Sequence, residues 1–162
     1  MEKVNFGIIG CGRISYRHIE AIQENQNAEL VSLCDLQLNR AKERNQGLGV
    51  TLYQDYNEML EKEHIDVVCI NTPSGMHAEH SIDIIEKHKK HIIIEKPMCL
   101  NVHDGMKMIK SADNNNVKLF IVHQNRFNNA IQKIRSMLDQ GKIGKVALAT
   151  VRLRWSRNQR YY

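Results

Sequence analysis

The sequence predicts an α/β fold in which helices cover both faces of a doubly wound parallel sheet. Two observations support this. Short apolar runs of strand length alternate with helical patterns from residue 3 to residue 123, as in successive βαβ units. In several runs, such as HIIIE at 91–95, the apolar residues are consecutive, which is typical of parallel strands buried on both faces. Right-handed crossovers then leave few possible topologies.

The first unit, residues 3–35, has the order and spacing of a dinucleotide-binding segment. A strand-like run leads into GCGRIS at 10–15, a G-x-G-x-x-S turn, and a second apolar run ends at Asp35. Gly10 permits a tight turn, and Gly12 lets the backbone approach a pyrophosphate. The free N–H groups at the start of the following helix attract phosphates. We therefore predict that this turn binds a dinucleotide.

The acid at the end of the second run indicates which dinucleotide. Asp35 lies 23 residues after Gly12, where its carboxylate can accept hydrogen bonds from the adenosine ribose. It would repel a 2′-phosphate, and Leu36 offers no cation to offset that charge, so NAD is favoured over NADP. Ser15 stands where Gly or Ala is usual, but it is small enough for close helix–strand packing. The alternative is a glycine-rich turn in another kind of α/β protein.

The remaining strands are expected where apolar runs end at polar or turn residues. These strands are predicted at 51–53, 66–71, 91–95 and 118–123. Proline at 97 cannot continue the third of them.

Helices are expected between these strands. Asp55, followed by Glu58, resembles a capping box, and Asn101 is a second N-cap with Asp104 three residues on. The helices are predicted from Ser15 onward, over 37–46, from Asp55 to about Glu63, after the turn at 71–75, from Asn101 and over 128–139. Their inward faces are expected at Ile14, His18 and Ile22; at Ala78, Ile82 and Ile85; at Val102, Met106 and Ile109; and at Ile131, Ile134 and Leu138.

Residues 145–155 have a different pattern. Ala147, Ala149, Val151, Leu153 and Trp155 share one parity, as in a half-buried antiparallel strand. Such a strand needs a sheet to join, so we predict a second α/β domain that begins near residue 125 and is incomplete. The predicted organisation is a dinucleotide-binding domain over 1–124 and the start of a substrate and oligomerisation domain over 125–162.

Composition excludes several classes of protein. No apolar run approaches the ~20 residues that a membrane span needs, and no secretory signal is visible, so a cytoplasmic protein is expected. The four cysteines, with no C-x-x-C pair among them, are expected to be reduced and buried. The net charge is +5, and residues 142–162 hold six Lys or Arg with no acid. A basic segment suits nucleic acid, but an anionic small substrate fits as well.

Polar residues at the predicted carboxyl ends of the strands should converge on one crevice. These are Gly10–Ile14, Asp35, Asn71–Pro73, Glu95–Pro97 and His123–Asn125. The lysine among them, Lys96, could hydrogen-bond a substrate hydroxyl or carbonyl and take part in proton transfer. Without that context, Glu95-Lys96 would be a surface ion pair.

Two histidines, His77 and His80, lie three residues apart on a predicted helix. No third ligand accompanies them, and a metal site needs three or four, so no metal is expected. His77 follows the turn at 71–75 and is a candidate for contact with the cofactor. His18 is expected to be a core residue or to support the site from behind.

Five motifs together resemble the N-terminal part of the glucose–fructose oxidoreductase/inositol dehydrogenase (Gfo/Idh/MocA) family. They are GIIGCGRIS at 7–15, Asp35, NTPSGMH at 71–77, EKP at 95–97 and VHQNRFN at 122–128. The resemblance implies a Rossmann domain followed by a domain with a large, mostly antiparallel sheet. It implies a nicotinamide cofactor, reversible oxidation of a sugar or cyclitol hydroxyl, and a homo-oligomer at full length. A cis Lys96–Pro97 bond is common in that family.

The resemblance also assigns residues. Lys96 would be the catalytic lysine that contacts the reacting hydroxyl. The tail VRLRWSRNQRYY at 151–162 is similar to family members encoded with lipopolysaccharide and surface-polysaccharide enzymes, including nucleotide-sugar 3-dehydrogenases for UDP-N-acetylglucosamine-type substrates, and Arg157 and Arg160 suit such an anionic substrate. The expected substrate contacts are Lys96 and Arg157, and the expected cofactor contacts are Gly10, Gly12, Arg13, Ile14, Asp35, Asn71, Thr72, Pro73, His77, Glu95, Lys96 and Asn125.

Two other classes of function remain as alternatives. One is a non-catalytic NAD-binding module that senses redox state or serves in assembly. The other is a nucleic-acid binder that uses the basic tail, which is the weakest reading because no recognition helix or RNA-binding signature accompanies the charge.

Overall fold

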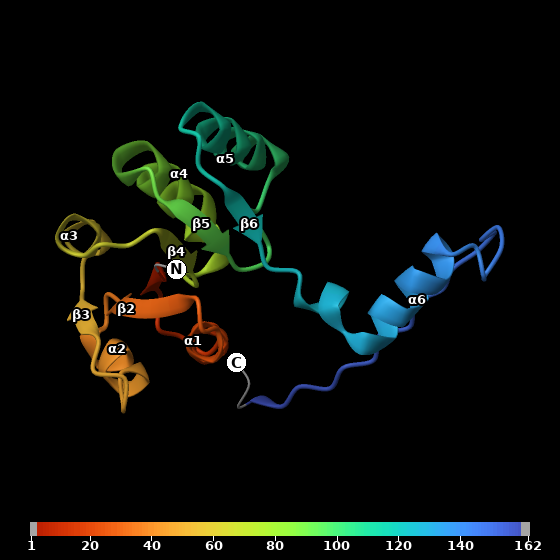
Figure 1. The fold of residues 1–162 in the computed structure, drawn as a ribbon, viewed down its shortest axis with the longest axis horizontal. Coiled ribbons are helices and arrows are strands. Elements are labelled where there is room, and N and C mark those ends of the chain that lie inside the picture. Colours follow the sequence, from red (N-terminus) through yellow and green to blue (C-terminus); the bar gives the residue numbers. More distant parts are fainter. Residues whose placement is uncertain (1–2, 160–162) are drawn as a thin grey trace. The chain divides into compact units, whose positions relative to one another are not determined.

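A computed structural model of the chain describes residues 3–159 and divides into two compact units, Met1–Val122 and His123–Tyr162. The first unit is a six-stranded parallel sheet in the order β3-β2-β1-β4-β5-β6 (Figure 1). The strand order reverses direction between β1 and β4, which confirms the predicted doubly wound fold. The strands are β1 Val4–Ile9, β2 Ala28–Cys34, β3 Thr51–Tyr53, β4 Val67–Ile70, β5 His91–Ile94 and β6 Leu119–Ile121.

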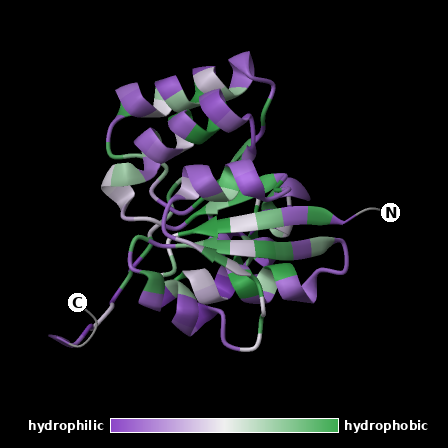
Figure 2. Ribbon diagram, turned by 90° about the vertical axis from the view of Figure 1, so that its left-hand side faces the viewer, coloured by the Kyte–Doolittle hydropathy of each residue, from purple (hydrophilic) through white to green (hydrophobic). Residues whose placement is uncertain are grey.

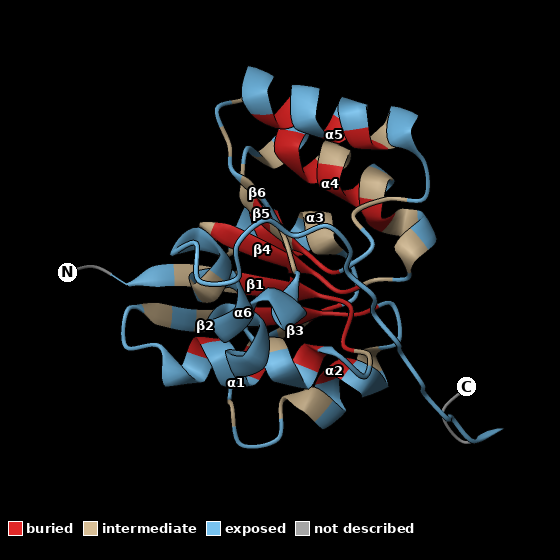
Figure 3. Cartoon of the chain, turned by 90° about the vertical axis from the view of Figure 1, so that its right-hand side faces the viewer, coloured by how far each residue is buried: buried red, intermediate tan, exposed pale blue. Residues whose placement is uncertain are grey.

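Helices cover both faces of the sheet, and each face has its own core. Helices α1 and α2 pack on one face with Ile19, Ile22 and Ala41 buried, while α3, α4 and α5 pack on the other. The apolar strands lie buried between the two helical layers (Figures 2 and 3). In this unit the helices are α1 Ser15–Glu24, α2 Leu38–Arg44, α3 Tyr56–Lys62, the short η1 Ser74–Met76, α4 His77–His88 and α5 Val102–Asn114.

The predicted helix starts are confirmed at two caps. The Asp55 carboxylate accepts hydrogen bonds from the N–H groups of Asn57 and Glu58 at the start of α3. The Asn101 side chain accepts one from the N–H of Asp104 at the start of α5. Each cap satisfies donors that have no partner within the helix.

The face of α5 is not the predicted one. Val102, Met106 and Ile109 are exposed, and the helix instead buries Gly105, Met108, Ser111 and Ala112. Both sets of residues recur at helical spacing. The buried face is the one that contains Gly105, where an added Cβ would lie 3.0 Å from the Cys99 sulfur. In α1, Ile22 is buried as predicted. Ile14, the residue before the helix, is exposed, and Ile19 is buried in the core in its place.

The second unit contains η2 Gln124–Phe127 and α6 Asn129–Asp139. The helix confirms the prediction for 128–139, but Ile131, Ile134 and Leu138 are all more than 40% exposed, so the expected burial of this face is wrong for the described chain. The strand predicted over 145–155 is also wrong, because these residues have no regular structure. A strand forms only where a partner strand accepts its backbone hydrogen bonds, and residues 123–159 contain none.

Among residues 3–159, no helix is both long and apolar enough to cross a membrane.

Candidate functional site

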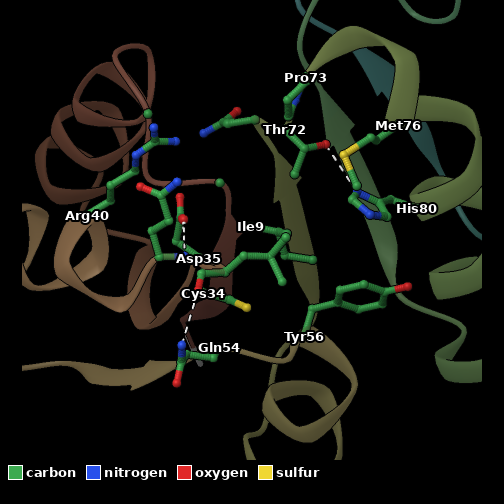
Figure 4. A pocket seen from close by; sticks show the side chains of 15 residues that line it. Ile9, Cys34, Asp35, Arg40, Gln54, Tyr56, Thr72, Pro73, Met76 and His80 are labelled. Carbon is green, nitrogen blue, oxygen red and sulfur yellow. Dashed lines mark hydrogen bonds between the residues drawn. The ribbon is translucent and has the colours of Figure 1, made fainter.

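The carboxyl ends of β1, β2 and β4 border a cavity of about 510 Å³ at the point where the strand order reverses (Figure 4). Its size is within the range of pockets that hold small ligands. Six predicted site residues line it: Gly10, Gly12, Asp35, Asn71, Thr72 and Pro73. The sequence therefore predicted one side of this cavity and the turns that approach it.

The two glycines of the turn, Gly10 and Gly12, differ in the space around them. Gly10 has φ +91°, and a Cβ there would lie 2.7 Å from the carbonyl carbon of Asn71 and 2.9 Å from the nitrogen of Thr72. Only glycine fits at this contact between the ends of β1 and β4. A Cβ at Gly12 would meet nothing within 4 Å, so the open space beside Gly12 is available to a ligand.

Asp35 joins the glycine turn to the end of β2. One carboxylate oxygen accepts a hydrogen bond from the Cys11 N–H at 2.8 Å, and the other accepts one from the Gln37 N–H at 2.8 Å. Asp35 is buried in the cavity wall. Because each carboxylate oxygen has a second lone pair, Asp35 can hold the turn and still accept a ligand hydroxyl.

The Asn71 side chain is buried without a hydrogen-bond partner among the described residues. It is only 8% exposed and lines the cavity, yet neither its amide nitrogen nor its amide oxygen has a hydrogen-bond partner within the described residues. Buried polar groups are nearly always paired, so such an exception needs an explanation. A polar ligand in the cavity would supply the missing partners.

The far side of the cavity was not predicted. Figure 4 shows Tyr56, Met76 and His80 across from Asp35, with Arg40 beside Asp35. His80 Nδ1 lies 3.1 Å from the Thr72 hydroxyl, and burial lowers the pKa of its imidazole. Arg40, on the same side as Asp35 and five residues after it in α2, was also not predicted. It places a cation beside Asp35, where the sequence analysis considered only Leu36.

His77 is buried and is not among the residues that line the cavity. Its Nδ1 lies 2.7 Å from the Pro97 carbonyl oxygen and its Nε2 lies 2.9 Å from the Thr72 carbonyl oxygen. The structure therefore gives His77 contacts that join the turn after β4 to the EKP segment, in place of the predicted contact with a cofactor. No group of three metal-ligating side chains occurs within residues 3–159.

The EKP segment is anchored by a buried pair. His18 Nε2 lies 3.0 Å from a Glu95 carboxylate oxygen, and both side chains are 11% exposed. The other Glu95 oxygen accepts a hydrogen bond from the Lys96 N–H at 3.3 Å. The Lys96–Pro97 bond is cis and the Lys96 side chain is exposed. Glu95 is thus not in the surface ion pair considered from the sequence; it links α1 to the backbone of Lys96.

This anchor predicts a pH dependence of stability. Burial raises the pKa of the Glu95 carboxyl, but hydrogen bonds and charge from His18 and Lys96 outweigh it, so the pKa lies below the usual 4.5. A lowered carboxyl pKa stabilises the fold above about pH 4.5, and the contribution is lost as the pH falls through the folded-state pKa. Glu95→Gln should therefore be less stable than the wild type in urea unfolding at pH 7. The difference between the two free energies of unfolding should become smaller below pH 4.5.

The matched control is Glu24→Gln, an exposed acid at the end of α1. It should leave the stability close to wild type at both pH values. If the difference in free energy of unfolding between Glu95→Gln and the wild type stays constant as the pH falls, the charge of Glu95 does not have the stabilising role given to it.

Other predicted contacts lie elsewhere. Arg13 and Ile14 are exposed at the start of α1 and do not line the cavity. Asn125 lies in η2, and the Arg157 guanidinium lies 4.8 Å from the centre of the Trp155 ring, both in the second unit. Their roles toward cofactor and substrate stay predictions.

The four cysteines are free thiols, as predicted, and Cys11, Cys34 and Cys69 are buried, whereas Cys99 is partly exposed. Burial is the main cause that raises the pKa of each buried thiol to about 12. These thiols are therefore poor nucleophiles at neutral pH.

Taken together, the cavity residues fit a dinucleotide. The turn leaves open space at Gly12, Asp35 presents a carboxylate, and Asn71 presents an unpaired amide. Gly12 would allow the pyrophosphate to approach, and Asp35 would hold the adenosine ribose.

Comparison with known proteins agrees with this site. A family model described as "Oxidoreductase family, NAD-binding Rossmann fold" matches residues 4–123. Myo-inositol 2-dehydrogenase of Thermotoga maritima is 33% identical over 143 residues, covering 88% of this chain and 42% of that protein. The chain thus spans less than half the length of this curated relative.

Two solved structures are similar over most of the chain. The WlbA dehydrogenase from Bordetella pertussis, in complex with NADH and UDP-GlcNAcA, is 36% identical with a TM-score of 0.93, covering 99% of this chain and 49% of that one. The scyllo-inositol dehydrogenase from Lactobacillus casei, with NAD(H) and scyllo-inositol, is 27% identical with a TM-score of 0.82, covering 88% and 43%.

Proposed function

Since this chain belongs to the oxidoreductase family with an NAD-binding Rossmann fold, we propose that it is the cofactor-binding half of an NAD-dependent dehydrogenase that oxidises a CH–OH group of a sugar or cyclitol. The observation that carries the proposal is the cavity at the ends of β1, β2 and β4, where the glycine turn, the Asp35 carboxylate and the unpaired Asn71 amide meet. The cofactor supplies the hydride chemistry, and the protein orients it and assists proton transfer.

Within that class we propose a nucleotide sugar of the UDP-N-acetylglucosamine type as substrate, oxidised at C3. The likeness to the WlbA dehydrogenase, a complex with NADH and UDP-GlcNAcA, covers nearly the whole chain and supports this choice over a cyclitol. The basic residues Arg152, Arg154 and Arg157 suit an anionic diphosphate. A protein that joins this chain to the second half of its relatives should reduce NAD with the nucleotide sugar faster than with myo-inositol, and a reversed order would overturn the substrate proposal.

The cofactor proposal is tested on the chain itself by calorimetric titration with NAD and NADP. The wild type should bind NAD saturably and more tightly than NADP. A folded wild type that binds neither dinucleotide would overturn the proposed function.

Asp35→Ala should weaken NAD binding by about 10–100-fold, because a hydrogen bond to a charged group contributes about 1.5–3 kcal/mol. It should also narrow the preference over NADP, since the charge that repels a 2′-phosphate is removed. The control is Glu43→Ala, an exposed acid on α2 outside the cavity, which should bind as the wild type does. Thermal unfolding of each variant separates lost affinity from lost folding, and an Asp35→Ala protein with unchanged NAD affinity would contradict the assignment.

A further inference from the structure

Arg44, the last residue of α2, reaches back to the glycine turn. Its Nε and Nη2 atoms donate hydrogen bonds to the Gly12 carbonyl at 3.3 and 3.1 Å, and Nε also lies 3.2 Å from the Ser15 hydroxyl oxygen. The Ser15 hydroxyl donates to the same Gly12 carbonyl at 2.7 Å. One turn carbonyl is therefore held by two side chains from two different helices.

These contacts give Ser15 a role that its size alone did not suggest. Gly and Ala are also small enough for this position, but they have no hydroxyl to donate to the Gly12 carbonyl or to accept a hydrogen bond from Arg44. Ser15 is fully buried, so its hydroxyl needs partners inside the protein. Gly12 and Arg44 are those partners.

The held carbonyl matters for an anion bound at the turn. A carbonyl oxygen carries partial negative charge, and if it turned toward the cavity it would repel a phosphate. The Gly12 carbonyl is held by Arg44, by the Ser15 hydroxyl and by the Ser15 N–H at 3.4 Å. These contacts keep it from turning toward a phosphate that the positive end of α1 attracts. Arg44 also adds its own positive charge close to the turn.

Two observations indicate that the turn faces a ligand. A Cβ at Gly12 would meet no atom within 4 Å, and the Asn71 amide in the same cavity wall is buried and unpaired. The charge of Arg44 reaches the turn as well: burial and Asp35 raise the pKa of the Cys11 thiol to about 12, and Arg44 opposes them.

We propose that Arg44, together with Ser15, is a positioning residue that holds the glycine turn in its phosphate-binding conformation and so sets the affinity for the diphosphate part of the dinucleotide. The inference rests on the proposed function. Arg44 contacts the glycine turn and does not line the cavity, whereas Arg40 does line it. Because the turn is the part of the site that would hold the diphosphate, loss of Arg44 should weaken binding of the diphosphate and not of the nucleoside.

The test compares ligands that differ in the diphosphate. NAD, ADP and adenosine are titrated into the wild type and into Arg44→Ala, Arg44→Lys, Ser15→Ala and the Arg44→Ala/Ser15→Ala double variant, with ligand-observed NMR for the weakest complexes. Arg44→Ala should weaken NAD and ADP by about tenfold and change adenosine by less than about twofold. Arg44→Lys keeps the charge but loses the two-pronged contact, so its affinities should fall between those of the wild type and Arg44→Ala.

The double variant tests the shared carbonyl. Because both side chains act on the Gly12 carbonyl, their effects should not be independent. The loss of NAD affinity in the double variant should be clearly smaller than the product of the losses in the two single variants. The matched control is Lys42→Ala, which removes an exposed cation from the same helix without touching the turn. It should bind all three ligands as the wild type does.

The outcomes separate this inference from the proposed function. A wild type that binds no NAD overturns the proposed function and this inference with it. A wild type that binds NAD, with an Arg44→Ala variant that loses adenosine and ADP equally or matches Lys42→Ala, overturns the inference alone. If Arg44→Ala does not fold, Arg44→Lys and Ser15→Ala provide the same comparison of ADP with adenosine.

Discussion

Replacing Lys96 by Met should lower kcat by about 10²–10⁴-fold in a protein that joins this chain to the second half of its relatives, which is the usual contribution of a positioned acid–base group. Lys96 follows β5, its side chain is exposed, and its N–H is bonded to Glu95. Its ammonium can therefore reach a substrate while its backbone is fixed. The measurement is steady-state NADH formation with the nucleotide sugar as substrate.

Two further variants test whether the loss of kcat comes from lost proton transfer and whether it is specific to Lys96. Lys96→Arg keeps a positive charge that is not given up in proteins, so it should restore little of the rate if Lys96 transfers a proton. Lys110→Met, on the exposed side of α5, should leave kcat unchanged. NAD affinity should be close to wild type in Lys96→Met, and a kcat within about threefold of wild type would contradict the catalytic assignment.

The order of elements could be predicted because it depends on local pattern. Consecutive apolar residues such as Val67–Ile70 identify buried parallel strands, and the caps at Asp55 and Asn101 identify helix starts. Which face of a helix is buried depends on what packs against it. Helix α5 has apolar residues on two faces, and the face that is buried is the one with Gly105 beside Cys99 in a helix that packs against α4. These tertiary contacts cannot be seen in the sequence.

The site was predicted as far as it follows the strand ends. Gly10, Asp35 and Asn71 come directly after β1, β2 and β4, so the topology brings them together. Arg44, at the end of α2, contacts the glycine turn, and His80, on α4, lines the cavity. Their positions depend on how α2 and α4 lie on the sheet. The strand predicted at 145–155 has the right alternation, but a strand also requires a partner, and alternation alone cannot supply one.

Gly10→Ala should destabilise the fold by about 2–5 kcal/mol and abolish NAD binding. A side chain at φ +91° costs about 1–2 kcal/mol, and a Cβ at 2.7 Å from the Asn71 carbonyl carbon adds about 1–3 kcal/mol of overpacking. The atoms in contact are backbone, so they cannot swing away. Urea unfolding measures the loss, and Gly47→Ala, with φ +79° and no atom within 4 Å of the added Cβ, isolates the cost of the backbone angle.

Gly12→Ala separates folding from binding at the same turn. Its Cβ meets nothing within 4 Å and its φ is not in the left-handed region, so the fold should be as stable as wild type or slightly more stable, because alanine reduces the freedom of the unfolded chain. The same Cβ would occupy the space through which a pyrophosphate approaches the backbone, so NAD affinity should fall by about tenfold or more. A Gly12→Ala protein that binds NAD normally would contradict the placement of the pyrophosphate at this turn, while the unfolding data for Gly10→Ala would still report on the contact with Asn71.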